Sequence, residues 1–127
     1  MTTVADVMNT DLVSVEPSAN LIQAVSAMSG AKSGSVLVLD AGSLVGIFTE
    51  RDVMRALAYA GNADRARVSM VERWMSEDPV TVEPTATVAD ALNQMLFRGF
   101  RHLPVVERDR VVGVVSMRDL ARSIASG

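Results

Sequence analysis

The chain contains an internal repeat, and this repeat constrains its fold more than any other feature of the sequence. The segment Gly46-Ile47-Phe48-Thr49-Glu50-Arg51-Asp52 recurs sixty-seven residues later as Gly113-Val114-Val115-Ser116-Met117-Arg118-Asp119. The same shift aligns residues 4–58 with residues 71–125 without a gap and gives seventeen identities over fifty-five positions. Self-similarity at a fixed period indicates a duplicated structural unit. We therefore expect two copies of one arrangement of strands and helices.

Length and composition narrow the class of protein. A copy of about 60 residues would be marginal alone, so the copies should share a core within the 127 residues. Hydrophobic residues make up 49% of the chain and aromatic residues 4%, which predicts an aliphatic core. The absence of cysteine excludes disulfides and thiol catalysis. A net charge of −3 makes binding to nucleic acid unfavourable.

We predict no membrane association and a cytoplasmic location. No apolar run approaches the roughly 18 residues that a membrane span needs. The first residues also lack the basic and apolar regions of a secretory signal.

Each copy is predicted to be a short helical lead-in followed by strand, helix, strand, strand and helix. In the first copy these elements are expected over residues 4–8, 12–15, 20–30, 35–40, 44–48 and 49–60. In the second copy they are expected over residues 71–75, 80–82, 87–98, 103–107, 111–115 and from 116 onward. The polar residues 61–67 are predicted to connect the copies, and residues 125–127 to form a disordered tail.

The hydroxyl and carboxylate of the repeated segment have two possible roles. Thr49 with Asp52, and Ser116 with Asp119, have the spacing of a capping box, in which both side chains satisfy free backbone N–H groups at a helix start. Thr87 with Asp90 has the same spacing outside the repeated segment. A helix N-terminus also suits a phosphate, and a nearby carboxylate can accept hydrogen bonds from a ribose diol. Capping and ligand contact therefore both remain open, and they can coexist.

Over nearly its whole length the sequence resembles a tandem pair of CBS domains. The resemblance rests on the order of elements, on Met8 and Met75 before a strand and a proline, and on the doubled Gly-x-x-Thr/Ser-x-Arg-Asp. It implies a stand-alone pair with an α+β fold, in which two β-α-β-β-α repeats pack by pseudo-two-fold symmetry around a shared cleft. The expected organisation is a first CBS domain over residues 1–60, a linker over 61–67 and a second CBS domain over 68–127.

The resemblance also implies a regulatory module that binds an adenine-containing metabolite between its halves. AMP, ADP, ATP, NAD(H) and S-adenosylmethionine all fit the family. No cofactor is required, and the adenine nucleotide acts as regulatory ligand. The residues expected in the first site are Thr49, Arg51, Asp52, Thr81, Arg101 and His102. Those expected in the second are Ser116, Arg118, Asp119, Ser14, Gly34 and Ser35.

The two predicted sites differ in charge. Arg101 and His102 open the second strand of the second copy, whereas Gly34 and Ser35 stand at the matching positions of the first. Since a guanidinium group offers a fork of donors to phosphate oxygens, we expect the first site to bind phosphate better. An apolar slot for the adenine ring is expected from Val13, Val15, Val36, Val80, Val82 and Leu103, for which ordinary core packing is the alternative.

Two other classes of function compete with a regulatory sensor. One is an interaction module that assembles as a homodimer or with an effector protein, for which the candidate interface residues are Met54, Leu57, Ala58, Tyr59 and Trp74. The other is an enzyme, which we do not predict. His102 is the sole histidine, no nucleophile motif or phosphate-binding glycine loop is present, and no ligand set for a metal accompanies the histidine.

Overall fold

The computed structural model describes residues 1–126 and forms two compact units. One unit, here called the continuous unit, spans Val13–Pro79. The other, called the split unit, combines residues 1–12 with residues 80–126. The fold is α+β, as predicted from the sequence.

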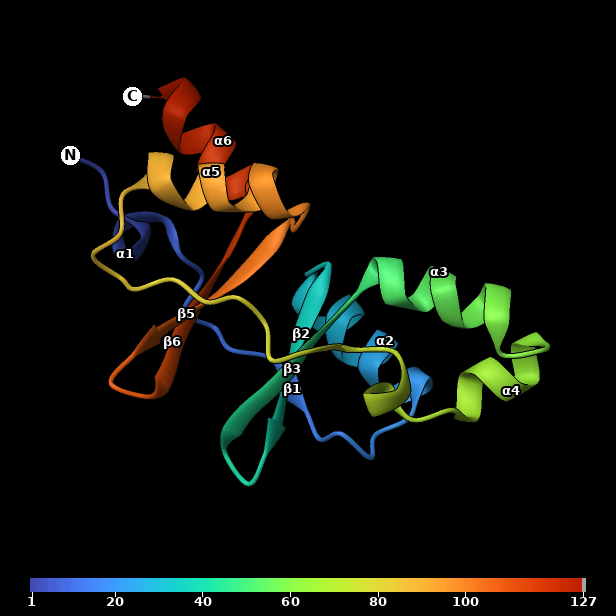
Figure 1. Ribbon diagram of the computed structural model, residues 1–127. Helices are drawn as coiled ribbons and strands as arrows, with labels where there is room; N and C mark the ends of the chain where they lie inside the picture. The colour runs from blue at the N-terminus through green and yellow to red at the C-terminus, as the bar shows by residue number, and fades with distance from the viewer. Residues whose placement is uncertain (127) are drawn as a thin grey trace. The chain divides into compact units, whose positions relative to one another are not determined.

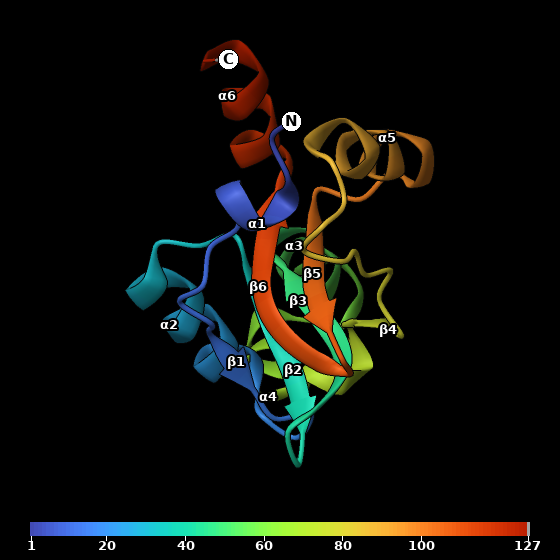
Figure 2. The same ribbon diagram turned by 90° about the vertical axis from the view of Figure 1, so that its left-hand side faces the viewer.

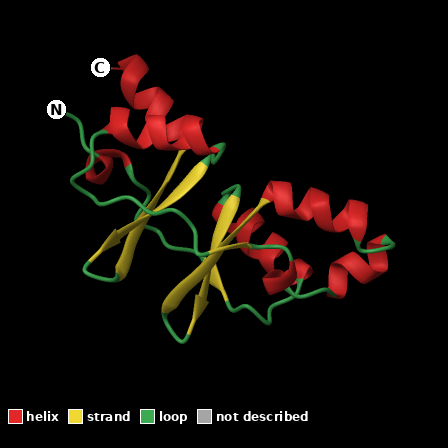
Figure 3. Ribbon diagram, in the orientation of Figure 1, coloured by secondary structure: helices red, strands yellow, loops and turns green. Residues whose placement is uncertain are grey.

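The continuous unit is built on a sheet of four strands with helices on one side (Figures 1 and 3). Its strands, in spatial order, are β1 (Ser14–Val15), β2 (Ser35–Asp40), β3 (Ser43–Thr49) and β4 (Ser76–Glu77). β1 is parallel to β2, whereas β2 with β3 and β3 with β4 are antiparallel. Its helices are α2 (Leu21–Ala31), α3 (Glu50–Tyr59), α4 (Ala63–Val68) and the 3₁₀ turn η1 (Val71–Arg73).

The core of the continuous unit lies between this sheet and its helices. The central strand β2 is buried over its first four residues, as its run of apolar residues predicted. Phe48 on β3 is fully buried and is one of the largest side chains in the core. The core residues are Leu21, Ala24, Met28, Val36, Val38, Phe48, Ala56, Ala60, Ala66, Val71 and Trp74.

The split unit repeats the same plan with a shorter sheet. Its elements are α1 (Val4–Val7), α5 (Val88–Arg98), β5 (His102–Glu107), β6 (Arg110–Ser116) and α6 (Met117–Ser126). β5 and β6 are antiparallel, and single bridges add Val82 beside β5 and Asn9 beside β6. In Figure 2, α1 lies next to β6. The core residues are Val4, Val88, Ala91, Met95, Leu103, Val105, Val115 and Leu120.

Each lead-in segment packs on the sheet of the other repeat. Asn9 bridges Val114, and at the matching positions Ser76 pairs with Ile47. The methionine that precedes Asn9 or Ser76 fills the space above a glycine of the strand with which that residue pairs. A Cβ atom added to Gly46 would lie 2.5 Å from Sδ of Met75, and one added to Gly113 would lie 2.6 Å from Sδ of Met8. These contacts explain why methionine and glycine recur together in both copies.

The lead-in helix α1 begins with a capping box that the sequence analysis did not identify. The backbone N–H of Thr3 donates to the carboxylate of Asp6 at 2.9 Å, and its hydroxyl does so at 3.1 Å. Chiefly because of the backbone hydrogen bond, the pKa of the exposed Asp6 carboxyl is lowered from its usual value. Since a lowered pKa favours the charged form, this cap is present above the ordinary pKa and is lost as the pH falls through the lowered one.

Several predicted element boundaries were wrong. Residues 61–67 were predicted only as a polar connection between the copies, and the helix α4, which begins at Ala63 and buries Ala66, was not predicted there. The predicted strand over residues 80–82 is reduced to the single bridge of Val82. Residues 125 and 126 belong to α6 instead of a disordered tail, and residue 127 lies outside the described residues. The short strand β4 was not predicted.

Trp74 was predicted to be an exposed interface residue, and this was also wrong. Its side chain is 5% exposed, and its indole N–H donates to Oγ of Ser69 at 3.0 Å. The other candidate interface residues, all on α3, are exposed: Met54, Leu57, Ala58 and Tyr59. Among residues 1–126, no helix has the length and apolar character needed to cross a bilayer.

Candidate functional site

The strand-to-helix turn of the continuous unit is held by the predicted hydroxyl and carboxylate pair. β3 ends at Thr49 and α3 begins at the next residue. The backbone N–H of Thr49 donates to Oδ2 of Asp52 at 2.9 Å, and the Thr49 hydroxyl lies 3.4 Å from the same oxygen. The capping interpretation of this spacing is therefore confirmed.

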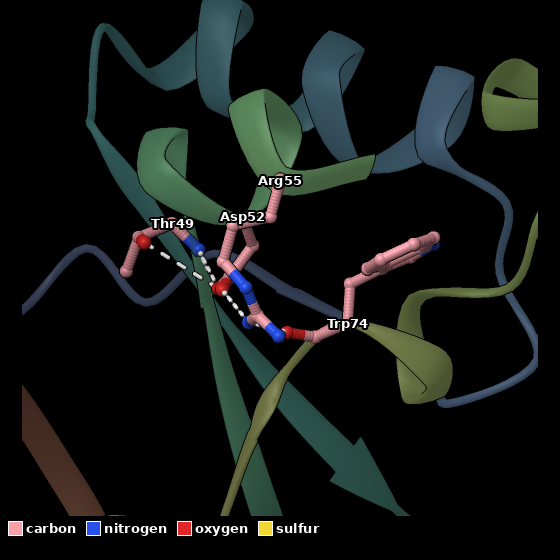
Figure 4. A network of polar contacts seen from close by, with 4 residues as sticks. All are labelled: Thr49, Asp52, Arg55 and Trp74. Carbon is pink, nitrogen blue, oxygen red and sulfur yellow. Dashed lines mark hydrogen bonds and ion pairs between the residues drawn. The ribbon is translucent and has the colours of Figure 1, made fainter. Parts of the chain in front are cut away.

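The carboxylate of Asp52 is buried and has a further partner. Only 6% of its side chain is exposed, and its Oδ1 accepts a hydrogen bond from Nη1 of Arg55 at 3.1 Å. The same nitrogen of Arg55 donates to the backbone carbonyl of Trp74 at 3.2 Å. Figure 4 shows these four residues converging at the start of α3. Both oxygens of this carboxylate are therefore engaged within the protein.

The equivalent turn of the split unit is held more loosely. The backbone N–H of Ser116 donates to Oδ2 of Asp119 at 3.4 Å, and the backbone N–H of Asp119 donates to the Ser116 hydroxyl at 3.1 Å. Capping is thus confirmed here as well. Asp119 is only partly buried, and within residues 1–126 Arg122, which corresponds to Arg55, forms no ion pair.

Each turn lies beside the start of the neighbouring strand of its own unit. In the continuous unit Ser35 pairs with Thr49, and the carbonyl of Gly34 accepts from the N–H of Glu50 at 3.1 Å. Ser14 pairs with Leu37, farther along β2.

The split unit repeats this arrangement. His102 pairs with Ser116, and the carbonyl of Arg101 accepts from the N–H of Met117 at 2.8 Å. Thr81 precedes the residue that bridges Val105. Each unit therefore brings together residues that the sequence analysis assigned to different sites.

The remaining predicted site residues differ in accessibility. Arg51, Arg101 and Arg118 are exposed, as is Thr81, whereas His102 is partly buried. Of the predicted adenine slot, Val36 and Leu103 are each 1% exposed and belong to the two cores. Core packing is therefore the better interpretation of these two. Val13, Val15, Val80 and Val82 are partly buried and pack against the cores.

Arg55 and the carbonyl of Trp74 also belong to the polar network, and neither was predicted from the sequence. Arg55 recurs as Arg122, three residues after the aspartate in both copies, so the sequence held a signal for the arginine. It held none for a backbone carbonyl. Within residues 1–126 no group of acidic or histidine side chains is arranged to hold a metal ion.

These observations define a duplicated α+β module in which each copy has a hydroxyl and a carboxylate at a strand-to-helix turn. The chain belongs to the CBS domain family, whose sequence model matches residues 4–59 and 70–126. It is a tandem pair of such domains.

Relatives of known sequence agree with this assignment. An uncharacterised 17.7 kDa protein of Acidianus ambivalens is 38% identical over 97% of this chain and 73% of its own length. The CBS domain-containing protein YhcV of Bacillus subtilis is 32% identical over 95% of this chain and 84% of its own length.

Solved structures share the fold. A CBS-domain protein of Agrobacterium tumefaciens matches with a TM-score of 0.89 and 31% identity, covering 97% of this chain and 99% of that one. The CBS pair of MJ0100, solved with 5′-methylthioadenosine and S-adenosyl-L-methionine, has a TM-score of 0.88, 23% identity and coverage of 99% and 98%. CBSX2, solved in complex with AMP, has a TM-score of 0.82, 24% identity and coverage of 99% and 98%.

Proposed function

We propose that this tandem CBS pair is a regulatory sensor that binds an adenine-containing metabolite at the Thr49–Asp52 turn. The observation that carries the proposal is the fixed carboxylate of Asp52 at the N-terminus of α3, next to a hydroxyl and to exposed Arg51. A carboxylate accepts hydrogen bonds from the two hydroxyls of a ribose. The helix N-terminus and the arginine suit a phosphate group.

The chemistry of the ligands in the similar solved structures supports this class of ligand. AMP, S-adenosylmethionine and methylthioadenosine share an adenosine moiety and differ at the 5′ position, where only AMP carries a phosphate. A site that recognises the ribose through a carboxylate would accept the shared part. The candidates AMP, ADP, ATP, NAD(H) and S-adenosylmethionine all contain it.

We further propose that Thr81, Arg101 and His102 complete this site, as the resemblance implies, and that it is the stronger phosphate site of the pair. The second proposed site combines Ser116, Arg118 and Asp119 with Ser14, Gly34 and Ser35. Arg101 provides an exposed guanidinium group for the first site, whereas Gly34 and Ser35 bring no cation to the second. Phosphorylated ligands should therefore prefer the first site.

Thermal unfolding of the purified protein with each candidate ligand tests the proposal. A ligand at a hundred times its dissociation constant adds about 2.7 kcal/mol of stability, which means a rise of several degrees for a chain of this size. We expect this rise to be lost in Asp52→Ala and less affected in Asp119→Ala. Because both substitutions also remove a helix cap, Thr87→Ala serves as control: its hydroxyl accepts from the N–H of Asp90 at 3.0 Å and has no proposed ligand role.

The second candidate function is a ligand-independent interaction module, which the exposed apolar residues of α3 favour. Met54, Leu57 and Tyr59 are 68%, 49% and 75% exposed. Such residues on one short helix would be covered in a homodimer or by an effector protein. If no adenine ligand raised the unfolding temperature while sedimentation showed a stable dimer, this function would replace the proposed sensor.

A further inference from the structure

Arg55 occupies an unusual position because one of its nitrogen atoms joins two distant parts of the chain. Its Nη1 lies 3.1 Å from Oδ1 of Asp52 and 3.2 Å from the carbonyl oxygen of Trp74 (Figure 4). A terminal guanidinium nitrogen carries two hydrogen atoms, so it can donate one to each acceptor. Arg55 therefore ties the start of α3 to the segment that follows η1.

The second of these partners, the carbonyl of Trp74, lies a few residues before the point where the chain passes from the continuous unit to the split unit. After Trp74 the chain forms β4, whose residues Ser76 and Glu77 pair with β3. It leaves the continuous unit at Pro79. Asp78 has a positive φ of 44° and donates its N–H to the carbonyl of Val45 at a long 3.3 Å. The segment is also held by the N–H groups of Trp74 and Met75, which both donate to the carbonyl of Val71 at 2.9 Å, and by the pairing of β4 with β3. Among these bonds, the one from Arg55 is the one that also involves the candidate site.

The carboxylate of Asp52 cannot accept a ribose diol without giving up a present partner. An ionised carboxylate offers about four acceptor positions. Oδ2 already faces the N–H and the hydroxyl of Thr49, and Oδ1 faces Arg55. Asp52 is buried, whereas the side chain of Arg55 is 49% exposed and can swing into solvent. The Thr49 hydroxyl is the longest of these contacts at 3.4 Å, but it shares Oδ2 with a backbone N–H, so a ribose that takes Oδ1 meets Arg55.

We propose that Arg55 is a positioning residue that couples occupancy of the Asp52 site to the order of residues 74–78. This inference rests on the proposed function. A ligand whose ribose takes Oδ1 of Asp52 releases the guanidinium group, and the bond to the Trp74 carbonyl is lost with it. The segment Trp74 to Asp78 then loosens. The ligand favours the arrangement in which Arg55 has left Asp52 over the one in which the two are paired. Such a difference in affinity between two arrangements is what a conformational switch requires.

The second repeat supplies a matched comparison. Arg122 stands three residues after Asp119, as Arg55 does after Asp52, but it forms no ion pair within residues 1–126. The coupling is therefore assigned to the first repeat alone. Arg122→Ala is the control for a lost exposed arginine at the same position of an equivalent helix.

Hydrogen–deuterium exchange of the backbone amides of Met75 to Asp78 tests the coupling, with AMP as the probe and calorimetry as the parallel measure of binding. In the wild type we expect AMP to accelerate exchange in this segment severalfold. Arg55→Ala should show the faster exchange without AMP and no further change with it. It should also bind AMP as tightly as the wild type or up to about fivefold more tightly, because no ion pair is displaced. Arg122→Ala should behave as the wild type.

The outcomes separate this inference from the proposed function. If AMP binds and Asp52→Ala abolishes binding, but exchange in residues 75–78 is unchanged or slowed by AMP, the coupling is wrong and the proposed function stands. Loss of AMP binding in Arg55→Ala would also contradict it, because Arg55 would then contact the ligand instead of yielding to it. If neither AMP nor ADP, ATP, NAD(H) or S-adenosylmethionine binds the wild type, the proposed function fails and the coupling fails with it.

Discussion

At the scale of single residues, a glycine and a methionine determine how each lead-in segment meets its sheet. A Cβ atom on Gly46 would lie 2.5 Å from Sδ of Met75 and 2.9 Å from the backbone carbonyl of Ser76. A flexible methionine side chain could move aside. The carbonyl of Ser76 belongs to β4 and can move only if the strand pairing changes.

Gly46→Ala should therefore destabilise the protein. We expect a loss of about 1–3 kcal/mol, the usual cost of inserting a methylene group into a packed core. Chemical denaturation would measure it, with Gly30→Ala as control. A Cβ atom on Gly30 meets nothing within 4 Å, and the residue lies in α2, so that substitution should raise stability by about 0.5–1 kcal/mol. If the two substitutions changed the free energy of unfolding equally, the space above Gly46 would not be tightly filled by Met75 and Ser76.

At the scale of elements, α4 shows where the sequence pattern is too weak to predict structure. Five of the six residues in Ala63–Val68 are exposed, and Ala66 alone is buried. A single small apolar residue produces almost no periodicity, so the segment resembles a polar connection. The helix is fixed by its tertiary surroundings. Asn62 caps it by accepting from the N–H of Arg65 at 2.9 Å, and Ala66 packs into the core of the continuous unit.

Ala66→Glu should test this account of α4. The substitution places an unpaired carboxylate in an apolar core, and we expect a loss of about 3 kcal/mol or more in the free energy of unfolding. Ala63→Glu is the control on the same helix, because Ala63 is exposed and an acidic residue at a helix start is favourable. If urea denaturation showed both variants to be as stable as the wild type, Ala66 would not contribute to the core.

The elements with strong local signals were predicted well. α2 begins at the predicted cap, where Asn20 and Gln23 form reciprocal hydrogen bonds of 2.9 Å. The carboxylate and hydroxyl of the Thr49–Asp52 turn were likewise evident from their spacing. Arg55 joins Asp52 to the carbonyl of Trp74, which lies nineteen positions after Arg55 in the chain. No sequence pattern indicates which backbone carbonyl a side chain will contact. The capping side chains of this turn could therefore be predicted from the sequence, but the engagement of both Asp52 oxygens within the protein could not.

At the scale of the whole molecule, the repeats exchange their lead-in segments. Val4 is fully buried in the core of the split unit, and Val71, at the matching position, is fully buried in the core of the continuous unit. A repeat in the sequence is therefore not the same set of residues as a compact unit. Each unit depends on a segment that the sequence repeat assigns to the other copy.

Val4→Ala and Val71→Ala should have complementary effects. Each removes two methyl groups from a core, and we expect about 2 kcal/mol of destabilisation from each. In native-state hydrogen exchange, Val4→Ala should lower protection in residues 80–126, whereas Val71→Ala should lower it in residues 13–79. Loss of protection in residues 13–60 upon Val4→Ala would contradict the exchange of lead-in segments.

The central claim is that the Asp52 turn binds an adenine nucleotide, and calorimetric titration with AMP tests it most directly. We expect the wild type to bind AMP and Asp52→Ala to bind at least about tenfold more weakly, because hydrogen bonds to a charged group are lost. Thr87→Ala, which removes a helix cap elsewhere, should bind as the wild type does. Binding by Asp52→Ala with unchanged affinity would contradict the claim and leave Asp52 as a helix cap alone.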